Sequence, residues 1–306
     1  MHRHELSQLA IASAETDEDL EALIAVRKIV TPRARPIVAN LRHALDSSTA
    51  ELRFIVARLG DDPVACGFVE GGSADFAPAD IAVVPDRRNL GVGSAVLAHI
   101  SRRAQGFGKD LLQFEVTKSD ENSRSFLERR GFEKVGGEEA VSLRLGGRQP
   151  NSVPPEGIRI LSRRARPDVV EAMYEVYVEC DRDVPGSSGS MTLEGWRALE
   201  IDRPSRSPDL AFIALDGEEV VGYAVADIFG DEGHHGFTAV KRAWRHRGIA
   251  TALKRAQIAA ANELGARRLA TGSEERNLPM RALNEKLGYQ PDPELSTVVL
   301  RGPVQA

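Results

Sequence analysis

The chain has few of the residues that mark several specialised protein classes. Only two cysteines, Cys66 and Cys180, occur in 306 residues, too few for a disulfide scaffold or a cysteine metal cluster. Both are expected to be small apolar residues packed inside. No apolar run approaches the roughly 18 residues that a membrane-spanning helix requires. The N-terminal segment MHRHELSQLAIASAETDEDL lacks an apolar core followed by a small-residue cleavage site, so we expect no secretory signal and a cytoplasmic protein.

An excess of positive charge is also missing. The formal net charge is −5, whereas domains that bind nucleic acid are usually basic, so we expect no nucleic-acid partner and no membrane partner. The composition that is present, 42% hydrophobic and 28% charged residues, is an ordinary globular balance with enough apolar material for a core. A length of 306 residues suggests about two domains.

One short pattern occurs twice, about half the chain apart. Arg-x-x-Gly-x-small is present as RNLGVG at Arg88–Gly93 and as RHRGIA at Arg245–Ala250. Repeated order of sequence signals around both copies indicates an internal duplication. The segment GGRQPNSVPPEG between them is rich in Gly and Pro and is typical of a linker. The sequence therefore predicts a domain at 1–147, a linker at 148–156 and a second domain at 157–306.

The same order of elements is expected in each half. In the first half we expect a helix at Asp17–Val30 capped by Thr16, a second helical piece after Pro36, and strands at LRFIVARL, DDPVACGFVE, DIAVVP, LLQFEV and AVSLRL. In the second half we expect helices at 167–179 and 193–199 and strands at GIRILS, LAFIAL, EEVVGYAVADI, GFTAV, RRLATG and STVVLR. In each half, a long amphipathic helix follows the glycine pattern and a short helix precedes the closing strand.

The glycines of both patterns fall at the N-terminus of the long helix, where backbone N–H groups have no intrahelical partner. Small residues leave these donors uncovered, and the helix dipole adds positive potential, so the pattern predicts a phosphate or pyrophosphate site. Four cations around the second copy suit further phosphates: Lys241, Arg242, Arg245 and Arg247. The pattern is also compatible with an ordinary strand-to-helix turn in which glycine provides only tightness. A dinucleotide fingerprint is excluded because Val96 takes the third glycine place, and a P-loop because no Gly-Lys-Ser/Thr is present.

With these elements in this order, both halves resemble the GNAT superfamily of acyl-CoA-dependent N-acyltransferases. The family signature, Arg/Gln-x-x-Gly-x-Gly/Ala, matches both glycine patterns, and a second family element matches Asn277 followed by Gly288-Tyr289. The resemblance implies an α+β fold of two tandem GNAT domains, each a mixed, mostly antiparallel twisted sheet flanked by helices. It also implies acetyl-CoA, or another acyl-CoA, as co-substrate, with no metal.

The resemblance further implies where the acyl-CoA binds. Its pyrophosphate is expected on the main chain from Arg245 to Thr251, and its pantetheine arm along the preceding strand. The implied cofactor-binding residues of the second half are Ala239, Val240, Arg245, Arg247, Gly248, Ile249, Ala250, Thr251, Asn277 and Asn284. Their expected counterparts in the first half are Val83, Val84, Arg88, Gly91, Val92, Gly93 and Ser94.

The first copy lacks more of the family's parts. Asp120 takes the place of Asn277, and an ionised carboxylate cannot donate a hydrogen bond. The family often has a Tyr four residues before the closing glycine, as acid toward the departing thiolate. Leu127 stands there in the first copy and Asn284 in the second. We therefore expect the second copy to be the catalyst and the first to be a degenerate copy that either still holds cofactor or shapes the acceptor site.

An alkyl amine of pKa about 10 needs a base, since only about one part in a thousand is neutral at pH 7, which adds roughly 4 kcal/mol of barrier. His234 stands where some family members carry a glutamate, with Glu232 and His235 beside it, and imidazole titrates in the required range. Counting back from the glycine pattern places Ala77 in this slot of the first copy. The alternative is that GDEGHHG is a loop of solvated polar residues.

The loop after the first helix of the second half is the expected acceptor site. Asp181 and Asp183 could attract a cationic amine, and Trp196 could pack against that amine. The alternative is that these acidic loop residues are only solvated, which is more common. The sequence thus predicts transfer of an acetyl group from acetyl-CoA to a primary amine of a small molecule, such as a metabolite or an antibiotic, by direct attack in the C-terminal domain. The alternative is a non-catalytic acyl-CoA-binding or regulatory protein, which the missing Tyr favours. The sequence does not predict the oligomeric state.

Overall fold

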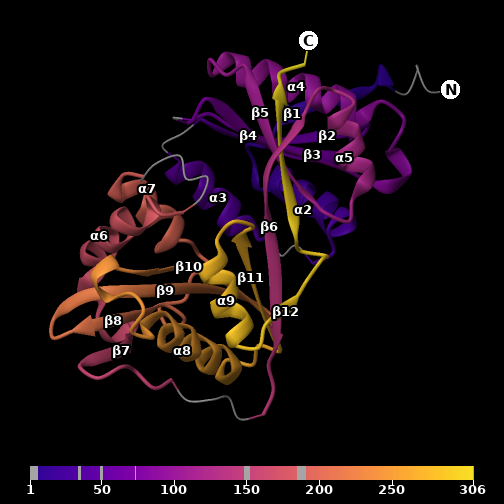
Figure 1. Cartoon of the computed structure of the whole chain (residues 1–306). Helices are drawn as coiled ribbons and strands as arrows, with labels where there is room; N and C mark the ends of the chain where they lie inside the picture. Colours follow the sequence, from indigo (N-terminus) through magenta and orange to yellow (C-terminus); the bar gives the residue numbers. More distant parts are fainter. Residues whose placement is uncertain are drawn as a thin grey trace. The chain divides into compact units, whose positions relative to one another are not determined.

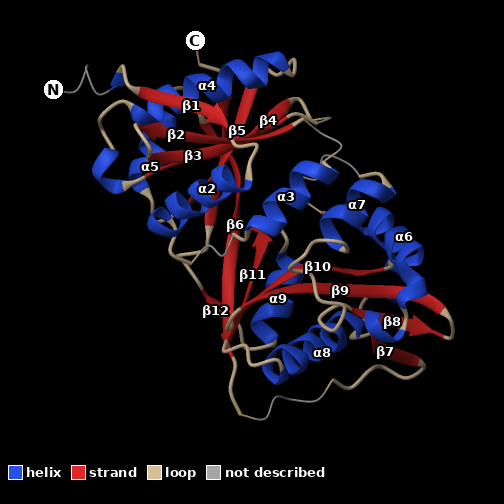
Figure 2. Cartoon of the chain, turned by 180° about the vertical axis from the view of Figure 1, so that it is seen from behind, coloured by secondary structure: helices blue, strands red, loops and turns tan. Residues whose placement is uncertain are grey.

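The computed structural model describes residues 6–33, 36–48, 51–72, 74–147, 152–184 and 191–305. The chain forms two compact units, each a mixed sheet flanked by helices, so the predicted α+β class is confirmed (Figures 1 and 2). Unit 1 comprises Met1–Val116, Asp120–Val135 and Val298–Ala306, and unit 2 comprises Thr117–Ser119 and Gly136–Thr297. Among the described helices, none has the length and apolar content of a membrane span.

Unit 1 has the strand order β1-β2-β3-β4-β5-β13. Neighbours from β1 to β4 run antiparallel, and β4 runs parallel to β5. The predicted first helix is confirmed as α2, with Thr16 as its N-cap in a capping box with Asp19. The elements are β1 (Leu9–Ser13), α2 (Asp17–Val30), α3 (Val38–Ser47), β2 (Leu52–Leu59), β3 (Asp62–Glu70), β4 (Phe76–Val83), η1 (Pro85–Arg87), α4 (Val92–Gly106), β5 (Leu111–Thr117), α5 (Glu121–Glu128) and β13 (Thr297–Pro303).

Unit 2 has the strand order β6-β11-β10-β9-β8-β7, with β12 beside β6. Only β10 and β11 are recorded as a parallel pair in this unit. The elements are β6 (Glu133–Arg144), β7 (Ile158–Ser162), η2 (Arg163–Ala165), η3 (Pro167–Val169), α6 (Val170–Asp181), α7 (Leu193–Glu200), β8 (Phe212–Asp216), β9 (Glu219–Phe229), β10 (Glu232–Val240), η4 (Arg242–Trp244), α8 (Ile249–Glu263), β11 (Arg268–Glu274), α9 (Leu278–Lys286) and β12 (Gln290–Pro291).

The two faces of the unit 2 sheet carry different cores. On one face, α6 and α7 bury an aromatic group that includes Trp196, Tyr177 and Tyr223. On the other face, α8 packs Ile249 and Leu253 against the strands. Central strand β9 is consequently buried on both faces along most of its length, which explains its nearly continuous apolar sequence.

The predicted domain boundary is wrong in one respect, because the closing strands are exchanged. Strand β6, from the N-terminal half, pairs with β11 from Glu138↔Glu274 to Arg144↔Arg268. Strand β13, from the C-terminal half, buries Val298 and Leu300 in the core of unit 1. Consecutive strands usually share a sheet, and the two closing strands have similar alternating patterns, so the sequence favoured the unexchanged arrangement.

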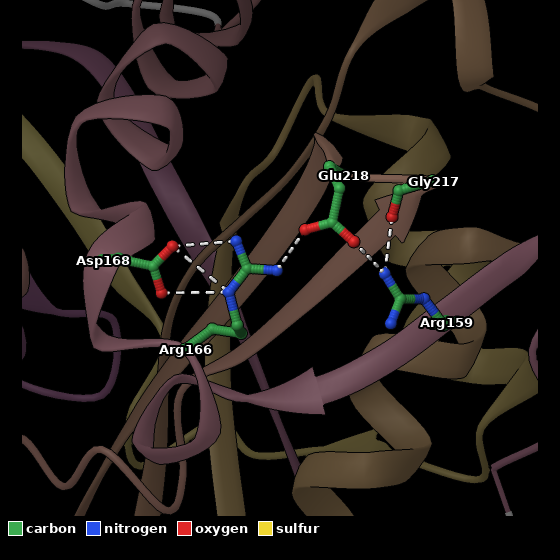
Figure 3. Close-up of polar contacts among 5 residues, drawn as sticks. All are labelled: Arg159, Arg166, Asp168, Gly217 and Glu218. Atoms are coloured by element: carbon green, nitrogen blue, oxygen red, sulfur yellow. Dashed lines mark hydrogen bonds and ion pairs between the residues drawn. The ribbon is translucent and has the colours of Figure 1, made fainter.

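A group of ion pairs surrounds the turn of the β8–β9 hairpin in unit 2 (Figure 3). Arg166 contacts both Asp168 and Glu218, while Arg159 donates to Gly217 O and Glu218. These pairs are exposed, and exposed pairs contribute little stability individually. The residues on either side of this hairpin turn contact the segment after β10. Lys241 Nζ donates to Glu219 at 2.8 Å, and Trp244 Nε1 donates to Asp216 at 3.2 Å.

Candidate functional site

Strands β10 and β11 separate after a short parallel pairing. They pair only from Glu232↔Arg268 to His234↔Ala270. Beyond this point β10 continues to Val240 beside β9, while β11 continues to Glu274 beside β6. The edge of β10 that includes Ala239 and Val240 therefore faces a gap in the strand pairing. An extended chain that carries amides can add to such an edge through main-chain hydrogen bonds.

A β-bulge lies at the point where the strands separate. The register passes from His235↔Ala226 to Thr238↔Ala224, so Gly236 and Phe237 together oppose one residue of β9. A bulge turns main-chain groups out of the ladder and is frequent beside active sites. Glycine avoids close contacts here, since a Cβ at position 236 would lie 2.8 Å from Nη1 of the buried Arg206 and 3.1 Å from Cγ2 of Val225.

Unit 1 has no such shift between the described strands β3 and β4, whose register runs regularly from Ala65↔Val83 to Val69↔Ala79. The bulge adds one residue to β10 relative to β4, and this corrects the predicted correspondence. His234 pairs with Ala270 as Pro78 pairs with Gln113, so the counterpart of His234 is Pro78 and not Ala77.

The second glycine pattern forms a turn that opens α8 with uncapped donors. His246 and Gly248 have φ of 62° and 87°, in the left-handed region. Helix α8 begins at Ile249 without a side-chain cap, and Ala252 N makes the first helical bond to Gly248 O. The N–H groups of Ile249, Ala250 and Thr251 therefore lie ahead of that bond, next to an exposed glycine. This geometry is the one that an anion site at a helix N-terminus requires.

The signature arginines support the turn and do not point at a phosphate. Nε of Arg245 donates to Val240 O at 2.9 Å, and Nε of Arg88 donates to Val83 O at 3.0 Å. Arg245 also pairs with Asp183 at 2.7 Å. The predicted role of Arg245 toward a further phosphate is not favoured by these contacts and stays a prediction. The side chains of both arginines join the end of the strand to the turn, which explains why the same residue occurs in both copies.

Most of the other cations near this turn are paired as well. Lys241 contacts Glu219 at 2.8 Å, and Arg242 contacts Asp183 at 2.6 Å. Arg247 is exposed, and no described carboxylate is recorded within ion-pair distance of it. Of the four cations predicted to serve further phosphates, Arg247 is thus the best placed to do so.

The predicted acceptor residues are occupied by protein contacts. The Arg242 and Arg245 guanidinium groups lower the pKa of Asp183 to about 2. Asp181 is buried at the end of α6, and Trp196 is fully buried in the aromatic core. These contacts do not favour the three side chains as an acceptor site, which stays a prediction. Opposite charges attracted Asp183 to the arginines, and the large apolar surface of Trp196 favoured burial.

The segment GDEGHHG, predicted to be either a strand with a catalytic base or a solvated loop, leads into strand β10 and forms its first residues. His235 is buried, with Nδ1 at 2.9 Å from Gln257 Oε1 and Nε2 at 2.5 Å from Tyr289 Oη. Burial holds the pKa of His235 well below its usual value. With both ring nitrogens bonded, His235 is not a base for substrate. Glu232 is also buried, before the strands separate, and His234 remains the predicted base.

Asn277 and Asp120 share a structural role that explains their shared position. Asn277 Oδ1 accepts from Met280 N at the start of α9, and Asp120 Oδ1 accepts from Ser123 N at the start of α5. Both are helix N-caps, for which Asn and Asp serve equally well. Asn284 lies further along α9, buried, with Oδ1 accepting from Lys254 Nζ at 2.8 Å.

Glu200, the last residue of α7, is a candidate that the sequence prediction missed. Its side chain is 15% exposed, and its Oε2 lies 3.6 Å from Arg206 Nη2. Burial raises the pKa of Glu200, while Arg206 and the Phe237 main-chain N–H of the bulge act in the opposite direction. The available signal was its helical spacing from Trp196, four residues earlier, which places both on one helix face.

The turn of unit 1 has the same backbone, and Leu6 lies against its glycine, which is exposed like Gly248. Gly91 has φ of 89°, and α4 begins at Val92 without a side-chain cap. A Cβ on Gly91 would lie 2.8 Å from Cδ1 of Leu6, whereas a Cβ on Gly248 would lie 3.9 Å from Cγ of Pro155. Arg130 also donates to Ser94 Oγ at 2.9 Å beside this turn. Leu6 and Arg130 therefore lie beside the first turn, while Gly91 and Ser94 themselves remain exposed.

Two parts of the chain match known sequence families. Residues 170–289 match the acetyltransferase (GNAT) family, and residues 50–134 match an acetyltransferase (GNAT) domain. The chain belongs to the GNAT acetyltransferases. Members of this family use acyl-CoA as a substrate.

Relatives of known name support this assignment. A mycothiol acetyltransferase from Catenulispora acidiphila is 27% identical over 213 residues, an alignment that spans 63% of each chain and so less than two thirds of that relative. A GCN5-related N-acetyltransferase from Sphaerobacter thermophilus has a TM-score of 0.75 at 18% identity, covering 98% of this chain and 96% of its own. A tandem GNAT protein from the clavulanic acid biosynthesis pathway has a TM-score of 0.77 at 19% identity, covering 97% and 99%. These two structures share the fold.

Proposed function

We propose that this tandem GNAT protein transfers an acetyl group from acetyl-CoA to a primary amine of a small molecule, and that unit 2 performs the reaction. One observation supports unit 2 most strongly. Its strand β10 combines a free edge, a bulge and an uncapped helix start within one strand-turn-helix segment. In unit 1, the described strands lack the bulge, and Leu6 lies against Gly91 of the turn.

In the proposed complex, the amides from Ile249 to Thr251, with the exposed Arg247, bind the diphosphate of the acyl-CoA. The free edge of β10 pairs with the pantetheine arm and directs the thioester to the bulge. A bulge N–H there opposes the negative charge that develops on the thioester oxygen, which is the usual source of rate enhancement in acyl transfer.

The acceptor amine is proposed to approach from the α6–α7 face. His234 is opposite Asp227 across the β9–β10 pair, so the two side chains share a face. Arg206 contacts both Asp227 and Glu200 on that face. We assign His234 as the base that removes the amine proton and Glu200 as the carboxylate that attracts the ammonium form.

The decisive experiment compares matched variants in the two copies. Ala250→Asp places a carboxylate in the first turn of α8, where it favours helix stability but repels a diphosphate. Gly93→Asp is the same change in unit 1, where a Cβ meets only ordinary contacts at 3.7 Å. We expect calorimetry to show one acetyl-CoA per wild-type chain, at least about tenfold weaker binding for Ala250→Asp, and little change for Gly93→Asp.

Turnover is measured by release of CoA thiol against a panel of amines. Loss of acetyl-CoA binding with Gly93→Asp and its retention with Ala250→Asp would assign the site to unit 1 instead. Tight acetyl-CoA binding without thiol release for any amine would favour the non-catalytic binding protein.

A further inference from the structure

Five polar side chains are buried together on the α8 face of unit 2. Each is at most 9% exposed. They come from β10, α8, α9 and the short segment after α9: His235, Lys254, Gln257, Asn284 and Tyr289. We call these five residues the polar core. Burial of a charged or polar group is unfavourable unless partners compensate for lost hydration.

Hydrogen bonds connect most of the polar core. Gln257 Nε2 donates to Leu210 O at 2.9 Å, which leaves its Oε1 to accept from His235 Nδ1. Tyr289 Oη then donates to His235 Nε2. Lys254 Nζ donates to Asn284 Oδ1 at 2.8 Å and lies 5.6 Å from the centre of the Tyr289 ring. Among the described residues, Asn284 Nδ2 is buried without a hydrogen-bond partner, so this donor is unused.

Unit 1 shows that the fold does not need the polar core. From the glycine pattern to the closing glycine, a residue of unit 2 has a number 157 higher than its counterpart in unit 1, as for Arg245 and Arg88 or Gly288 and Gly131. Before the bulge, the difference is 156. The counterparts are all apolar and at most 3% exposed: Ala79, Leu97, Ile100, Leu127 and Phe132. The same frame therefore packs well with hydrocarbon at every one of these positions. Since apolar replacement of buried ionic groups is often stabilising, the polar residues of unit 2 call for a functional explanation.

The polar core meets β10 at the point where a thioester is proposed to bind. His235 is the first residue of β10 beyond its pairing with β11 and the last before the bulge. Asn284 lies four residues before Gly288, where the family resemblance implies a Tyr that assists the departing thiolate. The unused Nδ2 of Asn284 is thus a donor at the place where this chain lacks a phenol.

We propose that Asn284 Nδ2 donates a hydrogen bond to the sulfur of the acyl-CoA thioester, and that Lys254 is a positioning residue that fixes and polarises the Asn284 amide. This inference rests on the proposed acetyl transfer. The amine nitrogen bonds to the carbonyl carbon and loses a proton to the base. The C–S bond breaks with its electron pair on sulfur, and the thiolate is stabilised by Asn284 and by the charge on Lys254. It takes a proton from water after release.

The electrostatics of Lys254 fit this role. Burial lowers the pKa of Lys254 to about 7. The groups that face it are His235 from β10, Asn284 from α9, Tyr289 after α9 and Gln257 on its own helix, and among the described residues no carboxylate is recorded in an ion pair with it. A thiolate near Asn284 would favour the protonated ammonium, and the ammonium in turn would favour the thiolate.

The test is a spectroscopic titration of the CoA thiol on the full-length protein, using the ultraviolet absorbance of the thiolate. We expect the pKa of the thiol of bound CoA to lie about one unit below that of free CoA, whose thiol is of the ordinary class near 8.5. Lys254→Leu and Asn284→Leu, which introduce the residues of unit 1, should each restore the value of free CoA. Lys254→Met keeps the side-chain volume in case the leucine variant misfolds.

Steady-state kinetics provide the second readout. We expect Lys254→Leu to lower kcat about 10- to 100-fold, with a small change in KM for acetyl-CoA, and to remove a loss of kcat that the wild type shows above about pH 7. An unchanged thiol pKa and an unchanged pH profile in both leucine variants would leave the polar core a purely structural feature and overturn the inference. If wild-type protein binds no CoA, the proposed function fails first, and this inference fails with it.

Discussion

Replacement of Lys254 by Leu should stabilise unit 2, by an amount that depends on pH. The substitution removes a buried ammonium whose recorded hydrogen-bond partner is Asn284 and introduces the residue that unit 1 has at the matching position, Leu97. Asn284 then loses a partner, which offsets part of the gain. The prediction is unusual because a substitution at the proposed site should raise stability while it lowers activity.

The magnitude follows from the pKa of Lys254. Burial lowers it from 10.5 to about 7 in the folded protein. At about 1.4 kcal/mol per unit, this difference corresponds to a penalty of about 4–5 kcal/mol while Lys254 is protonated in both states. Between pH 7 and 10.5 the unfolded chain binds more protons, so the free energy of unfolding of the wild type rises with pH. The advantage of Lys254→Leu should therefore be largest below pH 7 and shrink to about 2 kcal/mol at pH 9.

The assay is urea unfolding followed by tryptophan fluorescence. The chain has two tryptophans, Trp196 and Trp244, and both lie in unit 2, so the signal reports this unit. Lys286→Leu, which removes an exposed lysine at the end of α9, is the matched control and should change stability little. A Lys254→Leu advantage that is absent at pH 6, or that is constant from pH 6 to pH 9, would refute the reasoning.

Three further outcomes test the site. Arg247→Ala should weaken acetyl-CoA binding about 3- to 10-fold in calorimetry, since Arg247 is exposed and no ion pair with a described carboxylate occupies it. The loss of affinity should shrink at high salt. An equal loss at all salt concentrations would contradict a phosphate contact. Glu200→Gln should lower kcat/KM for the amine about 10- to 100-fold without affecting acetyl-CoA affinity. Because burial raises the pKa of Glu200, wild-type activity should fall as the pH drops through the pKa of this carboxyl group, and the variant should lack this acidic decrease in activity. Gly236→Ala should destabilise unit 2 by about 1–3 kcal/mol, since its Cβ would lie 2.8 Å from Arg206, whereas Gly136→Ala, with its nearest atom at 4.0 Å, should be neutral in the same urea assay.

Features set by neighbouring residues could be predicted from the sequence. Helix α2 begins and ends as its cap and periodicity indicate, at Asp17 and Val30. Both glycine turns adopt the same left-handed dihedral angles at Gly91 and Gly248, because the local pattern determines the backbone there. The division into two similar halves and the α+β class follow from the same local signals.

Features set by long-range contacts could not be predicted. The ion pair of Arg245 with Asp183 joins residues on different elements, and no local pattern distinguishes a paired aspartate from a solvated one. The bulge at Gly236 depends on the register against β9, which changed the correspondence of His234 between the halves. Glu200 became a candidate only when α7 placed it near Phe237.

The strand exchange gives a reason for keeping a copy whose described strands lack the bulge. Unit 2 takes β6 from the N-terminal half, and Val141 and Leu143 of this strand pack against the core around Leu269 and Tyr289. A fragment of residues 157–306 would leave the edge of β11 unpaired and this core exposed, which promotes aggregation. We expect that fragment to be insoluble or unfolded by circular dichroism, whereas a fragment of residues 133–296, which keeps β6 and omits β13, should fold and bind acetyl-CoA. If residues 157–306 fold alone with full affinity, the N-terminal half is not needed to complete the catalytic unit, and its retention must have another cause.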